Sequence, residues 1–156
     1  MSSPAVYAAG DAAAGGPNLT PVAGYEGRLV AANLLEGNHV TTDYAVVPSV
    51  VFTVPPLASV GLDERTARER GLRFTTHHEH TASWYSARRV GESASGFKVL
   101  VDDVSSRIVG AHLLGRDAEE VINLFAMAMR AGLSASDIQQ MLFAYPTSAS
   151  DMAYMM

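Results

Sequence analysis

The sequence contains no cysteine. A disulfide framework, a thiolate metal site and a cysteine nucleophile are therefore all excluded within these 156 residues. Basic residues are also scarce, because 11 Lys and Arg stand against 16 Asp and Glu, which gives a formal net charge of −5. Binding to nucleic acid depends on basic side chains that neutralise phosphates, so the composition argues against a nucleic-acid partner.

Long apolar runs are missing as well. No stretch approaches the roughly 20 apolar residues that a membrane-spanning helix needs, so we expect no membrane segment. The alanine-rich residues 1–16 lack the basic start of a signal peptide and include Asp11. Since 48% of the residues are hydrophobic and 17% are charged, the chain can bury a core. We expect a soluble cytoplasmic protein of one domain, or of one domain with a short appendage.

The clearest pattern begins with a predicted β-hairpin. Residues 97–101 are rich in β-branched types and predict a strand. Residues 102–106 supply Asp and Ser, whose side chains bond back to their own backbone in turns. Residues 108–114 then predict the returning strand.

A helix is predicted directly after this hairpin. Asp117 is the expected N-cap, with Glu120 at the capping-box position, and Gly132 ends the helix. One face carries an apolar stripe at helical spacing, formed by Ala118, Val121, Ile122, Phe125, Ala128 and Met129. A hairpin packed against an amphipathic helix predicts an α+β fold, with an antiparallel β-sheet and flanking helices.

Shorter patterns predict further elements. In chain order these are a strand over residues 5–9, a helix from Thr20 to Gly37, a strand over residues 50–54, a helix over residues 64–70 capped by Asp63, a strand over residues 73–81, an extended segment over residues 82–90, a helix from Ser134 to about Ala144 with Asp137 in a capping box, and a last turn of helix from Ser150 to Met156. Thr20 is the expected N-cap of its helix, with Pro21 in the first helical position.

The beginning of the chain is unusual because a lone strand and helix cannot bury their own apolar faces. This strand and helix, which end at Gly37, therefore look like a piece of a larger domain, and residues 38–49 are interpreted as a linker. The tail loop, residues 144–151, offers a tyrosine, hydroxyls and a carboxylate on a segment stiffened by Pro146. The alternative interpretation is a helix stop followed by the N-cap of the next helix.

Two further clusters have alternative interpretations. His78 and His80, next to His77, would share one face of a strand and suggest a metal site, but two imidazoles without thiolates do not complete one, so solvated histidines are favoured. The Thr20-Pro21 helix start, preceded by Gly10-Asp11, suits a polar or anionic cofactor. An ordinary strand–loop–helix connection explains the same residues.

Several motifs, in the right order, resemble a known family. Val6-Tyr7-Ala8-Ala9-Gly10-Asp11 and Leu19-Thr20-Pro21-Val22-Ala23 are similar to the second flavin-contact motif of the flavoprotein disulfide reductases, which include glutathione reductase, dihydrolipoamide dehydrogenase and mercuric reductase. From residue 50 onward the chain resembles the C-terminal dimerisation domain of these enzymes, through residues 56–62, 96–98, 108–111 and 145–147. The resemblance covers nearly the whole chain.

The resemblance implies that residues 1–46 end an FAD-binding domain and that residues 47–156 form the dimerisation domain. It implies a homodimer, with FAD carried by the complete protein and NAD(P)H as co-substrate. The family's Gly-rich FAD-binding unit, its redox-active Cys pair and its NAD(P)H domain would precede Met1, and these domains would be the other partners of this region.

The resemblance also implies cofactor-binding residues. Asp11 would hydrogen-bond the flavin ribityl chain. The helix that starts at Thr20-Pro21 would direct its N-terminus at the flavin pyrimidine edge, where a positive dipole favours electron density on the reduced ring. Leu19 and Ala23 belong to the same contact motif.

The tail loop departs from the family pattern, which is His-Pro-Thr with a Glu five residues after the His. In the family this His is the acid/base that serves the partner subunit's thiol. Here Tyr145 takes the His position, Ser150 takes the Glu position, and Asp151 follows. Tyrosine, with an ordinary pKa of about 10 against about 6.5 for histidine, is a poor proton shuttle near neutral pH. Tyr145 and Asp151 are the candidate catalytic residues, and we expect the Tyr145 phenol to position a substrate or water.

The leading hypothesis is the dimerisation domain of an FAD- and NAD(P)H-dependent oxidoreductase, inactive and unable to hold FAD as an isolated chain. The alternatives are a free-standing, non-enzymatic dimerisation module and a metal-binding protein that uses the histidine cluster. A two-fold homodimer is expected because the stripe from Val121 to Met129 and the segment Met141–Phe143 give more apolar surface than one small sheet can cover.

Overall fold

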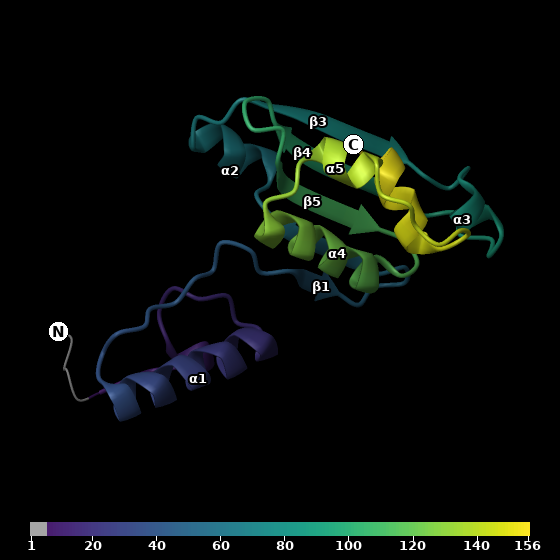
Figure 1. The fold of residues 1–156 in the computed structure, drawn as a ribbon. Coiled ribbons are helices and arrows are strands. Elements are labelled where there is room, and N and C mark those ends of the chain that lie inside the picture. Colours follow the sequence, from purple (N-terminus) through teal and green to yellow (C-terminus); the bar gives the residue numbers. More distant parts are fainter. Residues whose placement is uncertain (1–5) are drawn as a thin grey trace. The chain divides into compact units, whose positions relative to one another are not determined.

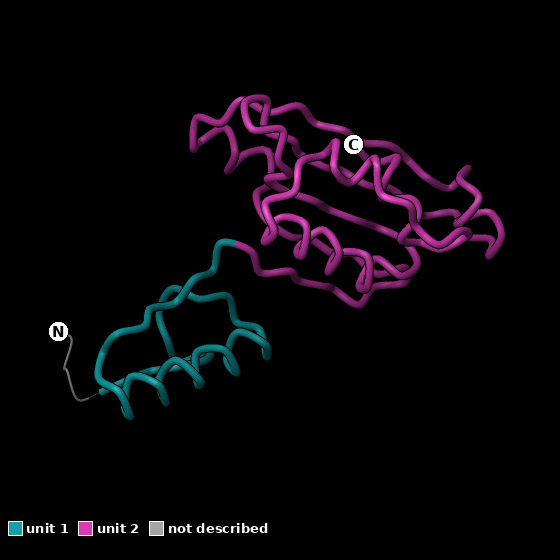
Figure 2. Tube along the Cα trace, in the orientation of Figure 1, with its two compact units in different colours: residues 1–45 teal, residues 46–156 magenta. Residues whose placement is uncertain are grey.

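The computed structural model describes residues 6–156, and the chain divides into two compact units, residues 1–45 and 46–156 (Figure 2). The helices and strands are, in order, η1 (Gly10–Ala12), α1 (Thr20–Glu36), β1 (Ser49–Val51), β2 (Leu57–Gly61), α2 (Glu64–Glu69), β3 (Phe74–His80), α3 (Tyr85–Arg88), β4 (Gly96–Asp102), β5 (Ile108–Leu114), α4 (Ala118–Ala131), α5 (Ala135–Gln139) and η2 (Ser148–Tyr154), where η marks a 3-10 helix (Figure 1).

The first unit is built on α1. The strand expected over residues 5–9 is wrong for residues 6–9, which have no regular structure, and Ala5 lies outside the described residues. A strand needs a neighbouring strand to take its backbone hydrogen bonds, and the described part of this unit contains none. The expected N-cap is also displaced by one residue, because Leu19 occupies the cap position and Thr20 is already helical.

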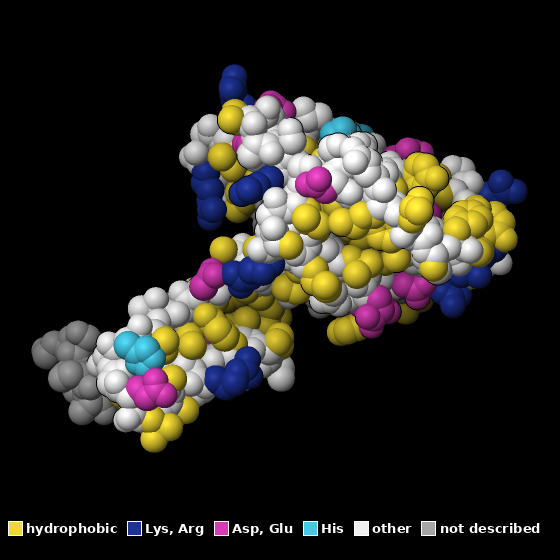
Figure 3. All heavy atoms as spheres, viewed as in Figure 1, with side chains coloured by type: hydrophobic (Ala, Val, Ile, Leu, Met, Phe, Trp, Pro, Cys, Tyr) yellow, Lys and Arg dark blue, Asp and Glu magenta, His cyan; other side chains and the backbone are white. Residues whose placement is uncertain are grey.

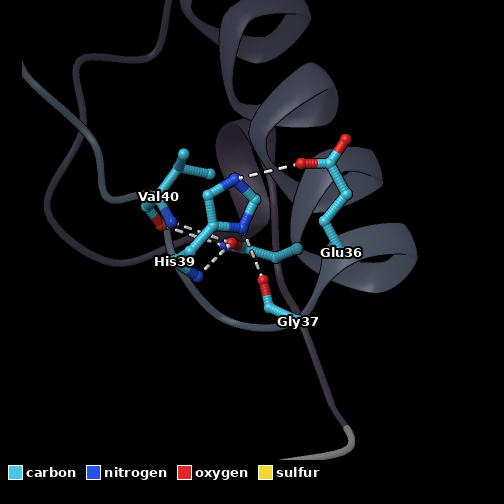
Figure 4. A network of polar contacts seen from close by, with 5 residues as sticks. Glu36, Gly37, His39 and Val40 are labelled. Atoms are coloured by element: carbon cyan, nitrogen blue, oxygen red, sulfur yellow. Dashed lines mark hydrogen bonds and ion pairs between the residues drawn. The ribbon is translucent and has the colours of Figure 1, made fainter.

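The end of α1 is fixed by a polar network (Figure 4). The side-chain oxygen of Asn33 accepts hydrogen bonds from the backbone N–H groups of His39 and Val40, both at 3.0 Å. The imidazole of His39 lies 2.7 Å from the carbonyl oxygen of Gly37 and 3.4 Å from the carboxylate of Glu36. These contacts turn the chain back after the helix, which ends at Gly37 as predicted.

The second unit contains one five-stranded sheet in the order β1-β2-β5-β4-β3, with every neighbouring pair antiparallel. The central hairpin of β4 and β5 confirms the two strands predicted over residues 97–101 and 108–114. The strand β3 agrees with the prediction over residues 73–81. The predicted α+β class, with an antiparallel sheet and flanking helices, is confirmed.

Helix α4 covers one face of the sheet (Figure 1). Its apolar stripe is buried against the strands, with Ile122 and Phe125 fully inaccessible to solvent. Gly132 adopts a positive φ of 70° and ends the helix as predicted. Because the sheet of the same chain already covers this stripe, the stripe is not the spare apolar surface from which a dimer was expected, and that part of the argument was wrong.

The strand predicted over residues 50–54 and the extended segment predicted over residues 82–90 both differ in the structure, because a strand forms only where a neighbouring strand can take its backbone hydrogen bonds. The strand predicted over residues 50–54 is shifted and shortened to β1, since Pro55 and Pro56 cannot donate to a ladder and the chain turns before them to form β2. No strand had been predicted at β2. The extended segment expected over residues 82–90 contains the short helix α3 instead. The last β3–β4 pair is His80 with Gly96, so the following residues have no strand to pair with.

The last part of the chain also differs from expectation. Helix α5 has the predicted capping box of Ser134 and Asp137, but it ends at Gln139 and not near Ala144. A chain that is not helical can advance up to about 3.3 Å per residue, against 1.5 Å in a helix. The non-helical residues 140–146 can therefore span a longer distance than the predicted helix would. The final turn starts at Ser148, two residues before the predicted start.

No helix among residues 6–156 combines the length and apolar character that crossing a bilayer requires.

Candidate functional site

The tail loop is held in a defined conformation by its own side chains. The hydroxyl of Thr147 donates to the carbonyl oxygen of Ala144 at 2.7 Å and accepts from the N–H of Ser150 at 3.2 Å. The hydroxyl of Ser150 lies 3.4 Å from the N–H of Thr147, which completes a capping box at the start of η2. The peptide bond before Pro146 is cis. The loop on both sides of Tyr145 is therefore ordered by local hydrogen bonds.

Asp151 is half-buried, and its carboxylate accepts a hydrogen bond from the hydroxyl of Ser86 in α3. Burial raises the pKa of the Asp151 carboxyl above its ordinary value, and the hydrogen bond from Ser86 opposes that shift. Sequence reasoning missed Ser86, and no local signal could have found it, because the two residues are 65 positions apart.

A second carboxylate, that of Asp117, binds the loop at Ser148. Ser148 donates from its hydroxyl to the carboxylate of Asp117 at 2.6 Å. The predicted capping box of Asp117 with Glu120 was wrong, because the Asp117 side chain makes no capping hydrogen bond and its backbone is left-handed, with φ of 61°. Asp tolerates this conformation better than most residues. Its carboxylate is thereby directed at the tail loop.

Tyr145 is exposed, with 71% of its surface accessible. Its ring lies near the ring of Tyr85 in α3, with 6.0 Å between centroids and 31° between planes. The structure thus attaches the two predicted catalytic residues, Tyr145 and Asp151, to adjacent residues of one short helix. Most of the Tyr145 side chain is accessible to an approaching molecule.

A small cavity of about 60 Å³ lies beneath the loop. Its walls include the hydroxyls of Ser86, Ser95 and Ser148, the carboxylate of Asp151 and the side chain of Arg116. The Ser95 hydroxyl is buried and has no hydrogen-bond partner in the protein. The space is sufficient for water, which would satisfy this hydroxyl.

The predicted flavin-contact residues come together within the first unit. Gly10 has a positive φ of 68° and lies against Ala23, because a Cβ placed on it would be 3.2 Å from the Ala23 Cβ. The buried carboxylate of Glu26 accepts from the N–H of Gly10 and from the hydroxyl of Tyr44, both at 2.5 Å. Sequence reasoning missed Glu26, which ties η1 and the linker to α1.

The groups offered by this unit fit a polar ligand. Asp11, in η1, is exposed, so its carboxylate is accessible to a ligand. The N-terminus of α1, formed by Leu19, Thr20 and Pro21, has no capping side chain. The backbone N–H groups of Val22 and Ala23 both donate to the carbonyl oxygen of Leu19. The feature that favours an electron-rich or anionic partner is therefore the positive end of a 17-residue helix.

The histidine cluster lies on the edge strand β3. His78 is paired with Lys98, and His80 is paired with Gly96. Across residues 6–156 no group of three or more His, Cys, Asp or Glu side chains is placed so that it could hold a metal ion. His77, His78 and His80 are therefore not assembled into a ligand set.

Comparison with known proteins shows three informative similarities. An uncharacterized 19.7 kDa protein in a mercuric resistance operon of Staphylococcus aureus is 48% identical over 157 aligned positions, which cover 100% of this chain and 87% of that protein. A glutathione reductase of Burkholderia cepacia is 35% identical, over 96% of this chain and 33% of the enzyme. The HOCl-induced flavoprotein disulfide reductase RclA from Escherichia coli, in its Cu(II) complex, superposes with a TM-score of 0.85 at 34% identity, over 96% of this chain and 34% of that one.

The chain thus spans about a third of the length of these two reductases and most of the length of the Staphylococcus aureus protein. Residues 47–156 match the family model described as the pyridine nucleotide-disulphide oxidoreductase dimerisation domain. The matched range contains the whole sheet, α4 and the tail loop. On this evidence the chain belongs to the pyridine nucleotide-disulphide oxidoreductase family, and residues 47–156 are its dimerisation domain.

Proposed function

We propose that this chain supplies the subunit interface and one wall of the active site in an FAD- and NAD(P)H-dependent oxidoreductase. The observation that carries the proposal is the tail loop, which is hydrogen-bonded on both sides of Tyr145 while the Tyr145 ring stays exposed. An ordered loop that leaves a phenol uncovered is suited to a second subunit. Tyr145 would donate a hydrogen bond to a substrate or water there, and Asp151 would hold the loop in place.

The interface itself would use apolar side chains that the sheet does not cover. Met127 on the outer side of α4 is 67% exposed, and Leu142 after α5 is fully exposed. A shallow hollow on α4 lies beside Met127 and is lined by Ala126 and Val46. Figure 3 shows hydrophobic side chains gathered over the α4 side of the sheet. Exposed apolar patches of this kind typically mark protein–protein contacts.

The first unit would contribute to the flavin site of the complete enzyme. Asp11 would bind the ribityl chain, and the N-terminus of α1, from Leu19 to Ala23, would face the pyrimidine edge of the flavin. The bound FAD would supply the electron transfer between NAD(P)H and the substrate. Residues 1–46 would then be the last part of an FAD domain. We expect the complete enzyme to be cytoplasmic, and the isolated chain to be inactive.

A test of the interface uses charge insertion at an exposed site. Met127→Lys should convert a dimer into a monomer in analytical ultracentrifugation at micromolar concentration, with an unchanged unfolding midpoint, because the side chain is exposed within one subunit. Val104→Lys is the matched control, since Val104 is 73% exposed but lies in the β4–β5 turn. An unsubstituted chain that is monomeric in this assay would refute the proposal.

A test of the flavin assignment uses the same purified chain. Because FAD is gripped chiefly by its adenine and pyrophosphate, the groups of Asp11 and α1 alone should not retain it. We expect no flavin absorbance after the chain is mixed with FAD and passed through gel filtration. A chain that remains yellow would show that residues 1–45 form a sufficient site by themselves.

A second candidate is a free-standing dimerisation module without enzymatic activity. The observation in its favour is the Staphylococcus aureus relative, of which this chain covers 87%. That relative is a protein in a mercuric resistance operon, so we propose mercuric resistance as the setting for such a module. An antibody against residues 46–156 distinguishes the two candidates in cells of the source organism. A band near the mass of 156 residues supports the module, whereas a band about three times larger supports the reductase.

A further inference from the structure

The exposed ring of Tyr145 has an aromatic neighbour, Tyr85. Both rings are largely accessible, at 71% and 55% respectively, so neither is held by burial in a core. Their separation and tilt fall within the usual range for an offset aromatic pair. The direction in which the Tyr145 phenol points therefore depends on Tyr85.

Tyr85 can act as a fixed support because the residues around it are anchored. The indole N–H of Trp84 donates to the carboxylate of Glu79 at 3.0 Å. The Trp84 ring contacts the ring of the buried Phe97, with 5.7 Å between centroids. Ala87, two residues after Tyr85, is 7% exposed. Helix α3 is thus attached to the sheet on both sides of Tyr85.

The loop that carries Tyr145 is attached to the same helix. Ser86 donates to Asp151, and Ser148 donates to Asp117 at the start of α4. These bonds fix the backbone of the loop but do not contact the Tyr145 ring. The hydrogen bonds that hold the loop and the ring contact of Tyr145 therefore come from different residues, and the ring contact comes from Tyr85.

We infer that Tyr85 is a positioning residue, which orients the phenol of Tyr145 toward the site that it serves in the partner subunit. The inference rests on the proposed function of the tail loop and adds a residue that lies outside the loop. The contact is between two tilted aromatic rings, so a phenylalanine at position 85 keeps it and an alanine removes it. The Tyr85 hydroxyl has no part in the inference.

The first test observes Tyr145 directly in the 156-residue chain. With ring-labelled tyrosine, the signal that disappears in Tyr145→Phe identifies Tyr145 among the 6 tyrosines. We expect nuclear Overhauser contacts between the rings of residues 85 and 145. Tyr85→Ala should move the Tyr145 ring signals toward those of free tyrosine, and Tyr85→Phe should leave them in place.

Tyr154→Ala is the control. Tyr154 is 73% exposed and pairs with Trp84, so it has the same chemistry and a neighbouring position, without contact to Tyr145. Its replacement should not move the Tyr145 signals. Absence of the contact between rings 85 and 145, or an equal response to Tyr85→Ala and Tyr154→Ala, would overturn the inference.

The second test measures turnover in the complete reductase. Tyr85→Ala should lower kcat/KM by about 2- to 12-fold, the range expected for the loss of one aromatic pair. Flavin reduction by NAD(P)H should be unchanged, and Tyr85→Phe should restore turnover. If Tyr145→Phe lowers turnover and Tyr85→Ala does not, the inference fails while the proposed function stands. If Tyr145→Phe has no effect, the proposed function of the loop fails, and the inference fails with it.

Discussion

The contact between Asp151 and Ser86 gives a prediction about stability and pH. Burial raises the pKa of the Asp151 carboxyl, while the hydrogen bond from Ser86 opposes that shift. A group whose pKa is higher in the folded than in the unfolded state favours folding when it is protonated. The contribution of Asp151 is therefore fully present below the unfolded value of about 3.9 and is lost as pH rises through its raised folded pKa. The ionised form of the Asp151 carboxylate is therefore the one that costs stability in the folded chain.

Two substitutions separate the parts of this arrangement. Asp151→Asn removes the ionisation and keeps an oxygen that can accept from Ser86, so at pH 7 the variant should be at least as stable as the parent chain. Ser86→Ala removes the donor and leaves a half-buried carboxylate unsatisfied. A hydrogen bond to a charged group contributes about 1.5–3 kcal/mol, and partial solvent access at Asp151 favours the lower end.

The assay is urea unfolding between pH 4 and pH 8. The stability difference between Asp151→Asn and the parent chain should increase with pH above about 3.9 and become constant above the folded pKa. Ser86→Ala should lower the unfolding free energy more at pH 7 than at pH 4, because only the ionised carboxylate depends strongly on the donor. In thermal unfolding at pH 7 the loss corresponds to roughly 2–4 °C per kcal/mol.

Asp137 provides the control of opposite sign. Hydrogen bonds from the side chain and backbone of Ser134 lower the pKa of its exposed carboxyl. Its contribution to stability is therefore present above the unfolded value and is lost as pH falls through the lowered folded pKa. Asp137→Asn should lower the unfolding free energy at pH 7 and should have little effect on it at the acid end of the range. If Asp151→Asn behaved in the same way as Asp137→Asn, the reasoning about burial at Asp151 would be refuted.

Two further predictions concern the scaffold that carries the loop. Gly110→Ala should prevent soluble expression, because the added Cβ would lie 2.0 Å from the carbonyl oxygen of Leu62. Gly27→Ala is the matched control inside α1. Its Cβ meets nothing within 4 Å, so this substitution should raise the unfolding free energy by about 0.5–1 kcal/mol. Phe125→Ala should lower it by about 3–5 kcal/mol in urea unfolding, since this fully buried ring fills the space between α4 and the sheet; a loss below 1 kcal/mol would contradict that packing.

The parts of the fold that sequence predicted correctly are those specified by local patterns. The β4–β5 hairpin is given by two runs of β-branched residues around a turn, and α4 is given by an apolar stripe that ends at Gly132. Strand β2 was missed because Leu57–Gly61 is short and includes small residues. Its place in the sheet comes from pairing with β5, for which a local pattern gives no signal.

The candidate site was only half predictable for the same reason. Tyr145 and Asp151 could be selected from the loop sequence and from the family resemblance. Their partners Tyr85 and Ser86 lie in a segment that was predicted to be extended, and they meet the loop only after the chain has turned at Trp84. Asp117 was recognised as a capping residue by its position, but long-range contact with Ser148 overrides the local choice.

The two carboxylates that hold the tail loop, Asp117 and Asp151, each carry a cost in folding free energy. Asp117 forgoes an N-cap, which typically contributes about 1 kcal/mol, and takes a left-handed backbone that costs on the order of 1 kcal/mol more. Asp151 is half-buried, and this burial raises the pKa of its carboxyl by disfavouring the charged form. Both costs are offset by hydrogen bonds from serines, Ser148 to Asp117 and Ser86 to Asp151, which fix the loop backbone. These bonds order the loop while the Tyr145 ring stays 71% exposed, which is the arrangement that the proposed role of Tyr145 requires.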